Sequence, residues 1–177
     1  MIKEISSTES SNMYSIKESK ISTFFDVITF ITLSIVIFGI FSLGFFVAPI
    51  IFSHLTPRPV ASETMTLIFM KYYPFAFTCS FISLFSESIS LFLSRKATNY
   101  KLSLVRFICI VAVFIMTSYT TNIIVPEIND MRINQKGPTL WTNPTFVSLH
   151  QQSEKLGKAS FGVGLIPLII MIIRKKK

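Results

Sequence analysis

The stretch FFDVITFITLSIVIFGIFSLGFFVAPIIFS, residues 24–53, decides the fold of this chain. A helix rises about 1.5 Å per residue, so about 20 apolar residues cross a hydrocarbon core of roughly 30 Å, and this run exceeds that length. Three further apolar runs follow at residues 66–93, 103–126 and 145–173. The pattern predicts an all-α integral membrane protein, folded as a four-helix bundle over residues 24–174.

The fourth run is the least uniform of the set. It is strongly apolar only from Ala159 to Ile173, which is too short to cross a membrane alone. The pair Asn143-Pro144 is typical of a helix N-cap followed by proline at the first helical position. We therefore predict one helix over residues 144–174, with an amphipathic first half that neighbouring helices shield.

The composition supports a membrane protein and argues against other classes. Of the 177 residues, 50% are hydrophobic and 15% are charged, and the mean hydropathy is +0.58; soluble domains contain about 25% charged residues. The net charge of +8 is not gathered into a basic and aromatic face, so we expect no nucleic-acid binding. Cys79 and Cys109 lie in apolar runs without CxxC spacing, which indicates apolar side chains rather than a disulfide framework or a zinc site.

Lysine and arginine are unevenly divided between the two ends of the predicted spans. The N-terminal tail, the loop at 94–102, Arg106 and the C-terminal tail carry 11 of them, and the opposite end carries 6. Because basic residues accumulate on the cytoplasmic side of a membrane, both termini are predicted to be cytoplasmic. The membrane would be the inner membrane of a bacterium, or the endoplasmic reticulum or another endomembrane of a eukaryote.

The segments outside the spans are polar. Residues 1–23 form a Ser-rich, charged tail that we predict to be disordered, and residues 175–177 form a basic tail. Residues 127–143 are predicted to be a long outer loop, in which Lys136-Gly137-Pro138 is a turn signal and Trp141 suits a membrane interface.

A polar residue inside a membrane span needs a partner or a purpose, and we single out three of them. They are Glu87, Arg106 and Asn122. Glu87 lies near the cytoplasmic end of the second span and Arg106 about one turn into the third. Adjacent antiparallel helices would bring them together, either as a clamp between helices or as part of a proton or ion relay, and a long arginine can also extend to the surface.

A second group of polar residues gathers at the outer membrane face. Both histidines of the chain lie there, His54 at the end of the first span and His150 near the start of the fourth. The outer-face cluster also contains Arg58, Glu127, Ser153 and Glu154. Helical spacing places His150 on the packing face of the fourth helix, beside small residues that allow close helix approach: Ser153, Gly157, Ser160 and Gly164.

The two histidines have several interpretations. His54 is the end of a span, followed by prolines that turn the chain. The ring of His150 would be hydrogen-bonded across helices, to Glu127 or Asn122. Alternatively, His54 and His150 hold a haem or a metal ion between the first and fourth spans, because imidazole is the commonest metal ligand.

Signatures of catalysis are missing from the sequence: it contains no P-loop, GxGxxG, HExxH or GxSxG motif. We therefore predict a non-catalytic membrane component that binds a ligand, a lipid or a membrane-protein partner at its outer face, or forms a homo-oligomer. The alternatives are a haem- or metal-binding redox or transport protein using the two histidines, and a proton-coupled transporter using Glu87.

Three motifs resemble a known family. They are GFFVAPIIFSHLTPRPVASETMTLIFMKYYPF in the first hairpin, IVPEINDMR at the end of the third span, and FVSLHQQSEKL at the start of the fourth. They are similar to the four-span family called domain of unknown function 4149, or transmembrane protein 205-like, over residues 30–165. The resemblance implies a four-helix membrane domain of unsettled biochemistry. Relatives are linked to drug resistance, and the fold is loosely similar to copper-resistance and haem-associated membrane families.

Overall fold

A computed structural model describes residues 2–93, 100–134, 140 and 143–174, with the side chains of residues 2–19, 58 and 174 outside the description. All the long elements are helical. They are α1 (Ile2–Ser42), the π-helical segment η1 (Leu43–Val47), α2 (Ala48–His54), α3 (Arg58–Leu93), α4 (Tyr100–Tyr119), the π-helical segment η2 (Thr120–Ile124), α5 (Val125–Asn134) and α6 (Pro144–Arg174).

These elements form four long, apolar helical rods, as predicted. The candidate membrane spans are Lys20–His54, Pro59–Leu93, Tyr100–Asn134 and Pro144–Ile173. The all-α four-helix membrane bundle is therefore confirmed, and the cytoplasmic placement of the termini stays a prediction. The helix α1 begins within the polar tail at residues 1–23, whose predicted disorder also stays a prediction.

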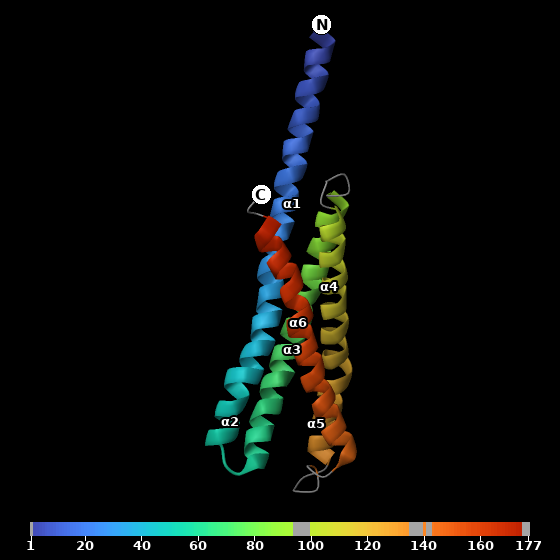
Figure 1. Cartoon of the computed structure of the whole chain (residues 1–177). Coiled ribbons are helices and arrows are strands. Elements are labelled where there is room, and N and C mark those ends of the chain that lie inside the picture. The colour runs from blue at the N-terminus through green and yellow to red at the C-terminus, as the bar shows by residue number, and fades with distance from the viewer. Residues whose placement is uncertain (1, 94–99, 135–139, 141–142, 175–177) are drawn as a thin grey trace.

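The four rods pack in an up-and-down order. The helix α1 contacts α3 and α6, and α4 contacts the same two helices, so each rod touches its neighbours in the chain and α6 closes the ring against α1. The start of the bundle at α1 and the end of α6 lie at the same end (Figure 1). We call this the terminal end, and the opposite end, with the turn between α2 and α3, the hairpin end.

Two of the rods contain a π-helical segment just before an internal proline. Each π-helical segment ends two residues before a proline, Pro49 after η1 and Pro126 after η2. A proline ring clashes with the carbonyl four residues earlier, which here belongs to Phe45 in η1 and to Asn122 in η2. Because a π-turn is wider than an α-turn, it moves that carbonyl away from the ring and lets the helix continue.

The prediction of a loop over residues 127–143 was therefore wrong in its first half. The third rod runs on through α5 to Asn134, and only part of the connection to α6 is non-helical. The turn at residues 136–138 and Trp141 lie outside the described residues.

The middle of the bundle is a continuous apolar core. Its buried members are Leu33, Val36, Ile37, Ala76, Cys79, Ile110, Val113 and Leu168. Two small residues on α6 lie against this core: Ser160 is buried, and a Cβ atom at Gly164 would overlap the Ile37 side chain. At Gly157 a Cβ atom would lie 3.5 Å from Ile40, which is ordinary contact, and Ser153 is half-buried.

Candidate functional site

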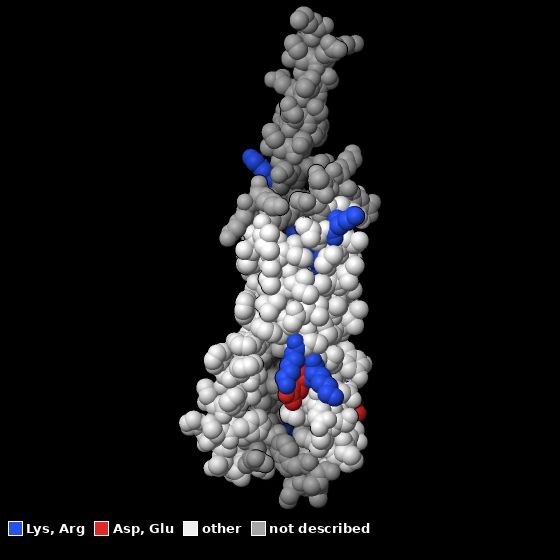
Figure 2. Space-filling view, in the orientation of Figure 1, with Lys and Arg blue, Asp and Glu red and all other residues white. Residues whose placement is uncertain are grey.

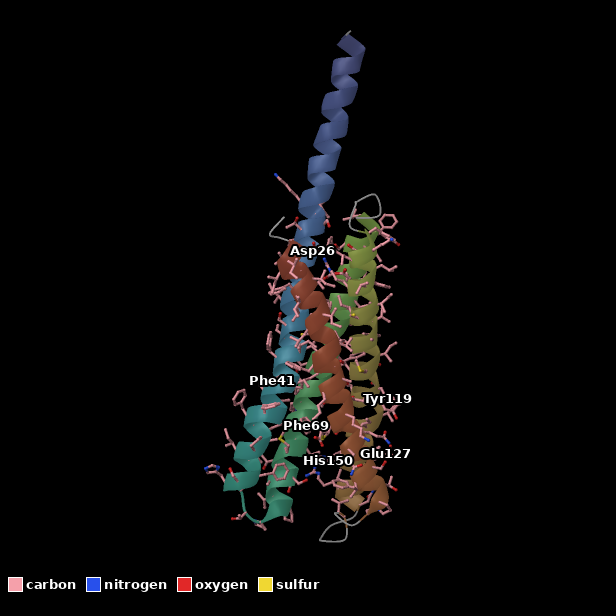
Figure 3. All side chains as sticks on the ribbon, in the orientation of Figure 1. Asp26, Phe41, Phe69, Tyr119, Glu127 and His150 are labelled. Carbon is pink, nitrogen blue, oxygen red and sulfur yellow. The ribbon has the colours of Figure 1, made fainter. Side chains whose placement is uncertain are left out.

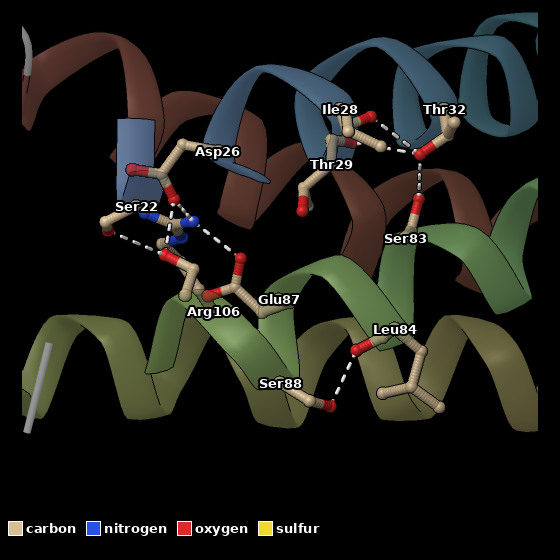
Figure 4. A network of polar contacts seen from close by, with 11 residues as sticks. Ser22, Asp26, Ile28, Thr29, Thr32, Ser83, Leu84, Glu87, Ser88 and Arg106 are labelled. Atoms are coloured by element: carbon tan, nitrogen blue, oxygen red, sulfur yellow. Dashed lines mark hydrogen bonds and ion pairs between the residues drawn. The ribbon is translucent and has the colours of Figure 1, made fainter. Parts of the chain in front are cut away.

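The most polar site of the bundle is an ion triad buried near the terminal end (Figure 4). The Arg106 guanidinium on α4 donates through Nη2 to Glu87 Oε2 on α3 at 2.5 Å and to Asp26 Oδ1 on α1 at 2.7 Å. The side chains of Arg106 and Glu87 are each 1% exposed, and that of Asp26 is 22% exposed. The triad therefore joins three helices through one guanidinium group.

Hydroxyl groups extend the triad along the interface between α1 and α3. Ser90 donates to Asp26 Oδ1 at 2.8 Å and lies 3.3 Å from the Ser22 hydroxyl. Further into the bundle, Thr32 and Ser83 share a hydrogen bond of 2.6 Å. One face of α3 is polar and buried along this interface, with Ser80, Ser83, Ser86, Glu87 and Ser90 each at most 2% exposed.

The sequence had predicted part of this site. The expected contact of Glu87 with Arg106 is present, and its role as a clamp or as part of a relay stays a prediction. Asp26 and the serines of α3 were missed. A signal did exist, because Asp26 is the only charged residue in the apolar run at residues 24–53.

The third intramembrane polar residue lies far from the triad along α4 and η2. Asn122 is exposed, and its side-chain amide donates to the Ser118 carbonyl on the preceding turn at 2.9 Å. The hydrogen bond of the Asn122 side chain is therefore made within its own helical rod and not to another helix.

A small cavity lies at the hairpin end, where the hairpin of α2 and α3 diverges from α5 and α6 (Figures 1 and 3). Its volume is about 60 Å³. Four elements contribute to its lining: Phe52 from α2, Ser62, Met65, Thr66, Phe69 and Tyr73 from α3, Val125 and Ile128 from α5, and Phe146, His150 and Ser153 from α6. The lining thus combines aromatic rings with a few hydroxyl groups and one imidazole.

His150 lies at the edge of this cavity rather than in the packed face of α6. His150 is exposed, while Phe146 and Leu149 beside it are buried. The imidazole stacks on the Phe146 ring, with centroids 6.5 Å apart and planes 4° apart. The placement on the packing face was therefore wrong for His150, because the diverging hairpin opens the bundle at that level.

His54 ends α2 and binds its own helix. Its Nδ1 lies 3.0 Å from the Ile50 carbonyl oxygen and 2.8 Å from the Ser53 hydroxyl, and the residue is exposed. It is not among the residues lining the cavity beside His150. Among the residues that the structure describes, no group of three or more His, Cys, Asp or Glu side chains is arranged to hold a metal ion.

The other members of the predicted outer-face cluster have separate surroundings. Glu154 pairs with Lys158 on α6 at 2.6 Å, and the Ser153 hydroxyl donates to the His150 carbonyl at 2.8 Å. Glu127 is exposed on α5, and the side chain of Arg58 lies outside the described residues. Figure 2 shows basic and acidic side chains gathered on one face of the bundle towards the hairpin end.

The ion pair between Arg132 and Glu63 at this end was not predicted. Arg132 on α5 lies 3.1 Å from Glu63 on α3 and donates to Asn129 at 3.1 Å. It was missed because residues 127–143 were expected to be a loop, where the side chain of Arg132 has no fixed direction. The pair holds α5 against α3 beside the cavity.

Comparison with known families gives a match that covers much of the bundle. The sequence model of a domain of unknown function, DUF4149, matches residues 31–136, which is more than half of the chain. The chain belongs to the DUF4149 family. No curated protein and no solved structure matches it.

The DUF4149 match covers some of the predicted motifs and leaves others out. It includes the hairpin of α2 and α3 and the whole of α5, together with Glu87, Arg106 and Arg132. It leaves out Asp26 and all of α6, so the resemblance at residues 146–156 stays a prediction. The match also does not confirm the similarity to transmembrane protein 205, which stays a prediction. The family establishes a multi-pass membrane protein and assigns no activity to it.

Proposed function

We propose that this DUF4149 protein is a non-catalytic membrane component that binds a small amphipathic ligand at its hairpin end. The observation that carries the proposal is the cavity between α2, α3, α5 and α6. Ligand sites in proteins are typically concave and mostly apolar, with a few polar groups that set orientation. Phe52, Phe69 and Phe146 supply the apolar surface, and Thr66 and His150 supply hydrogen-bonding groups.

The size of the cavity limits what can enter it. Pockets for drug-sized ligands measure about 300–1,000 Å³, whereas this cavity measures about 60 Å³. The ligand is therefore either very small or a longer amphipathic molecule, such as a lipid, that inserts only one end. Such a molecule would enter between the elements that line the cavity, the hairpin of α2 and α3 and the pair α5 and α6.

Filling the cavity tests this proposal. Ser153→Trp places an indole in the cavity, while Gln152→Trp adds the same group at an exposed neighbour on α6. Native mass spectrometry of the full chain, extracted in a mild detergent, should show a small-molecule adduct for the wild type and for Gln152→Trp. The adduct should be lost in Ser153→Trp. An adduct that persists in a folded Ser153→Trp protein, or is absent from the wild type, would contradict the proposal.

The haem or metal alternative receives less support. It requires His54 and His150 to face one ligand, yet only His150 lines the cavity and the Nδ1 atom of His54 is engaged by its own helix. The cavity is also several times smaller than pockets for drug-sized ligands. A proton-coupled transporter using Glu87 would need a protonatable group inside the bundle, and the ion triad is the place for it.

The orientation and the membrane system belong to the same proposal. The excess of basic residues at the terminal end favours cytoplasmic termini. The ligand cavity would then face the outside of a bacterial inner membrane, or the lumen of a eukaryotic endomembrane compartment. A membrane-protein partner or a second copy of the chain would bind against the exposed apolar side chains of η1 and α2, among them Phe45, Phe46 and Ile50.

A further inference from the structure

We propose that the cavity at the hairpin end binds the hydroxyl end of an uncharged long-chain alcohol. This inference rests on the function proposed above and names the chemistry of the ligand end that enters the cavity. It follows from which groups of the lining already use their protons in hydrogen bonds.

Two hydroxyl groups of the cavity lining donate to backbone carbonyls of their own helices. Thr66 Oγ1 on α3 donates to the Ser62 carbonyl at 2.9 Å, and Ser153 Oγ on α6 donates to the His150 carbonyl at 2.8 Å. A carbonyl oxygen only accepts, so the single proton of each hydroxyl is in use and the oxygen keeps its capacity to accept. Thr66 and Ser153 therefore offer acceptors to a ligand, and the matching ligand group is a donor.

This arrangement disfavours ligand ends that only accept hydrogen bonds. Carboxylates, esters, ketones and ethers have no proton to donate, so their oxygens would face the lone pairs of Thr66 and Ser153. A polar group buried without a hydrogen-bond partner is costly, and a site that binds a hydroxyl group rejects analogues that lack it. The ligand end therefore carries an O–H or N–H group.

An ammonium end would also donate, but its positive charge needs an acid nearby when it is buried. Four acids belong to the elements at the hairpin end, and none of them lines the cavity: Glu63, Glu127, Asp130 and Glu154. The residues outside the described ranges between α5 and α6 contain no Asp or Glu in their sequence. The donor at the ligand end is therefore uncharged.

A hydroxyl end also suits the other polar groups of the lining. Tyr73 has a phenolic hydroxyl and His150 an imidazole, and both types of group can donate. An alcohol donates to Thr66 or Ser153 and accepts at the same oxygen. It is also small enough for a cavity of about 60 Å³, where aromatic rings such as that of Phe69 contact the first carbons of its chain.

The experiment compares four amphiphiles that share one alkyl chain: dodecanol, dodecyl methyl ether, dodecanoic acid and dodecylamine. Each is added to the full chain in a mild detergent, and the bound fraction is measured by native mass spectrometry. The wild type should bind dodecanol roughly tenfold more tightly than the other three, because only the alcohol is an uncharged donor. Ser153→Trp, which fills the cavity, should remove this binding.

Two threonines of α3 provide a matched pair of variants. Thr66→Val keeps the shape of the side chain and removes its oxygen, so the preference for dodecanol over the methyl ether should fall severalfold. Thr64→Val is the control. The Thr64 hydroxyl donates in the same way to the Val60 carbonyl, at 2.9 Å, and Thr64 is not among the residues lining the cavity. Its replacement should leave the preference unchanged.

The outcomes separate this inference from the proposed function. If the ether, the acid or the amine binds as tightly as dodecanol and is lost in Ser153→Trp, the cavity is a ligand site but the alcohol class is overturned. A preference for dodecanol that is unchanged in Thr66→Val would also overturn it. If none of the four binds, or dodecanol still binds a folded Ser153→Trp protein, the proposed function fails and this inference with it. The comparison of ligands on the wild type decides the class even where Thr66→Val does not fold.

Discussion

At the scale of single residues, Arg106 is the group through which three helices of the bundle are joined. Its guanidinium group is the only positive charge that contacts Glu87 and Asp26 within the described part of the chain, and it joins α4 to α3 and α1. Removing one partner of a buried ion pair leaves a charge without compensation, which is more costly than never having had the pair.

We therefore expect Arg106→Ala to lower the free energy of unfolding by about 3–5 kcal/mol, while Glu87→Gln, which keeps a polar group of the same shape, has a much smaller effect. Unfolding by denaturant in lipid bicelles measures both. Lys158→Ala is the control, because the pair of Lys158 with Glu154 is on the surface and such pairs contribute little. Equal stability of Arg106→Ala and the wild type would show that the triad is not a clamp.

The sequence predicted only two thirds of this triad. Glu87 and Arg106 belong to consecutive helices joined by a short connection, so their depths in the membrane could be compared directly. Asp26 lies 61 residues before Glu87 in the chain, and nothing in the local pattern fixes the rotation of α1 about its axis. That rotation is set by packing, including the contact of Gly39 with the Tyr72 ring.

At the scale of elements, the pairing of α1 with α3 depends on the close approach of Gly39 to the Tyr72 ring. A Cβ atom at Gly39 would overlap the Tyr72 ring, and the Tyr72 hydroxyl donates to the Val36 carbonyl at 2.8 Å. The ring is rigid and cannot bend away from an added methyl group. The interface therefore tolerates glycine here and little else.

Gly39→Ala should destabilise the bundle by about 1–3 kcal/mol, the usual effect of overpacking. Gly162→Ala on α6 is the matched control, since a Cβ atom at Gly162 has nothing within 4 Å; alanine there should be neutral or slightly stabilising, because alanine is the better helix former. Thermal unfolding of the two variants in the same detergent compares them. If Gly39→Ala is as stable as Gly162→Ala, the helices do not pack as described.

The elements also show why sequence patterns predicted the rods better than their ends. Apolar runs of this length specify membrane helices almost irrespective of context. Pro126 ends a helix unless the chain before it can widen into a π-turn. The segment η2 is such a π-turn. It is held to α3 by a hydrogen bond of 3.2 Å, which the Thr121 hydroxyl donates to the Tyr73 carbonyl. Such support from another helix is not visible in a local pattern.

At the scale of the whole molecule, the exposed lysines indicate where hydrocarbon surrounds the bundle. At the terminal end Lys20 and Lys101 are exposed, and towards the hairpin end Lys71 and Lys158 are exposed. Lys71 lies at the level of Leu43 on the first rod, beside the same surface groove. Lys20 and Leu43 are about 34 Å apart by helix rise, which matches a core of roughly 30 Å.

Two consequences follow for the sites. The ion triad lies just inside the hydrocarbon near the terminal end, and the cavity lies near or beyond the opposite boundary. Between them, the apolar core around Leu33, Val36, Ile110 and Val113 separates the two polar regions. The bundle therefore presents a separate polar site near each membrane surface.

Cysteine labelling in sealed membranes tests the central claim, that four helices cross a bilayer between these levels. Single cysteines replace Lys20, Phe38, Ile108 or Gln152 in a chain whose Cys79 and Cys109 are changed to alanine, and a membrane-impermeant maleimide is added to one side and then to both. Lys20→Cys and Gln152→Cys should react from opposite sides, and Phe38→Cys and Ile108→Cys should not react. Labelling of Phe38→Cys and Ile108→Cys from water, or of Lys20→Cys and Gln152→Cys from the same side, would contradict it.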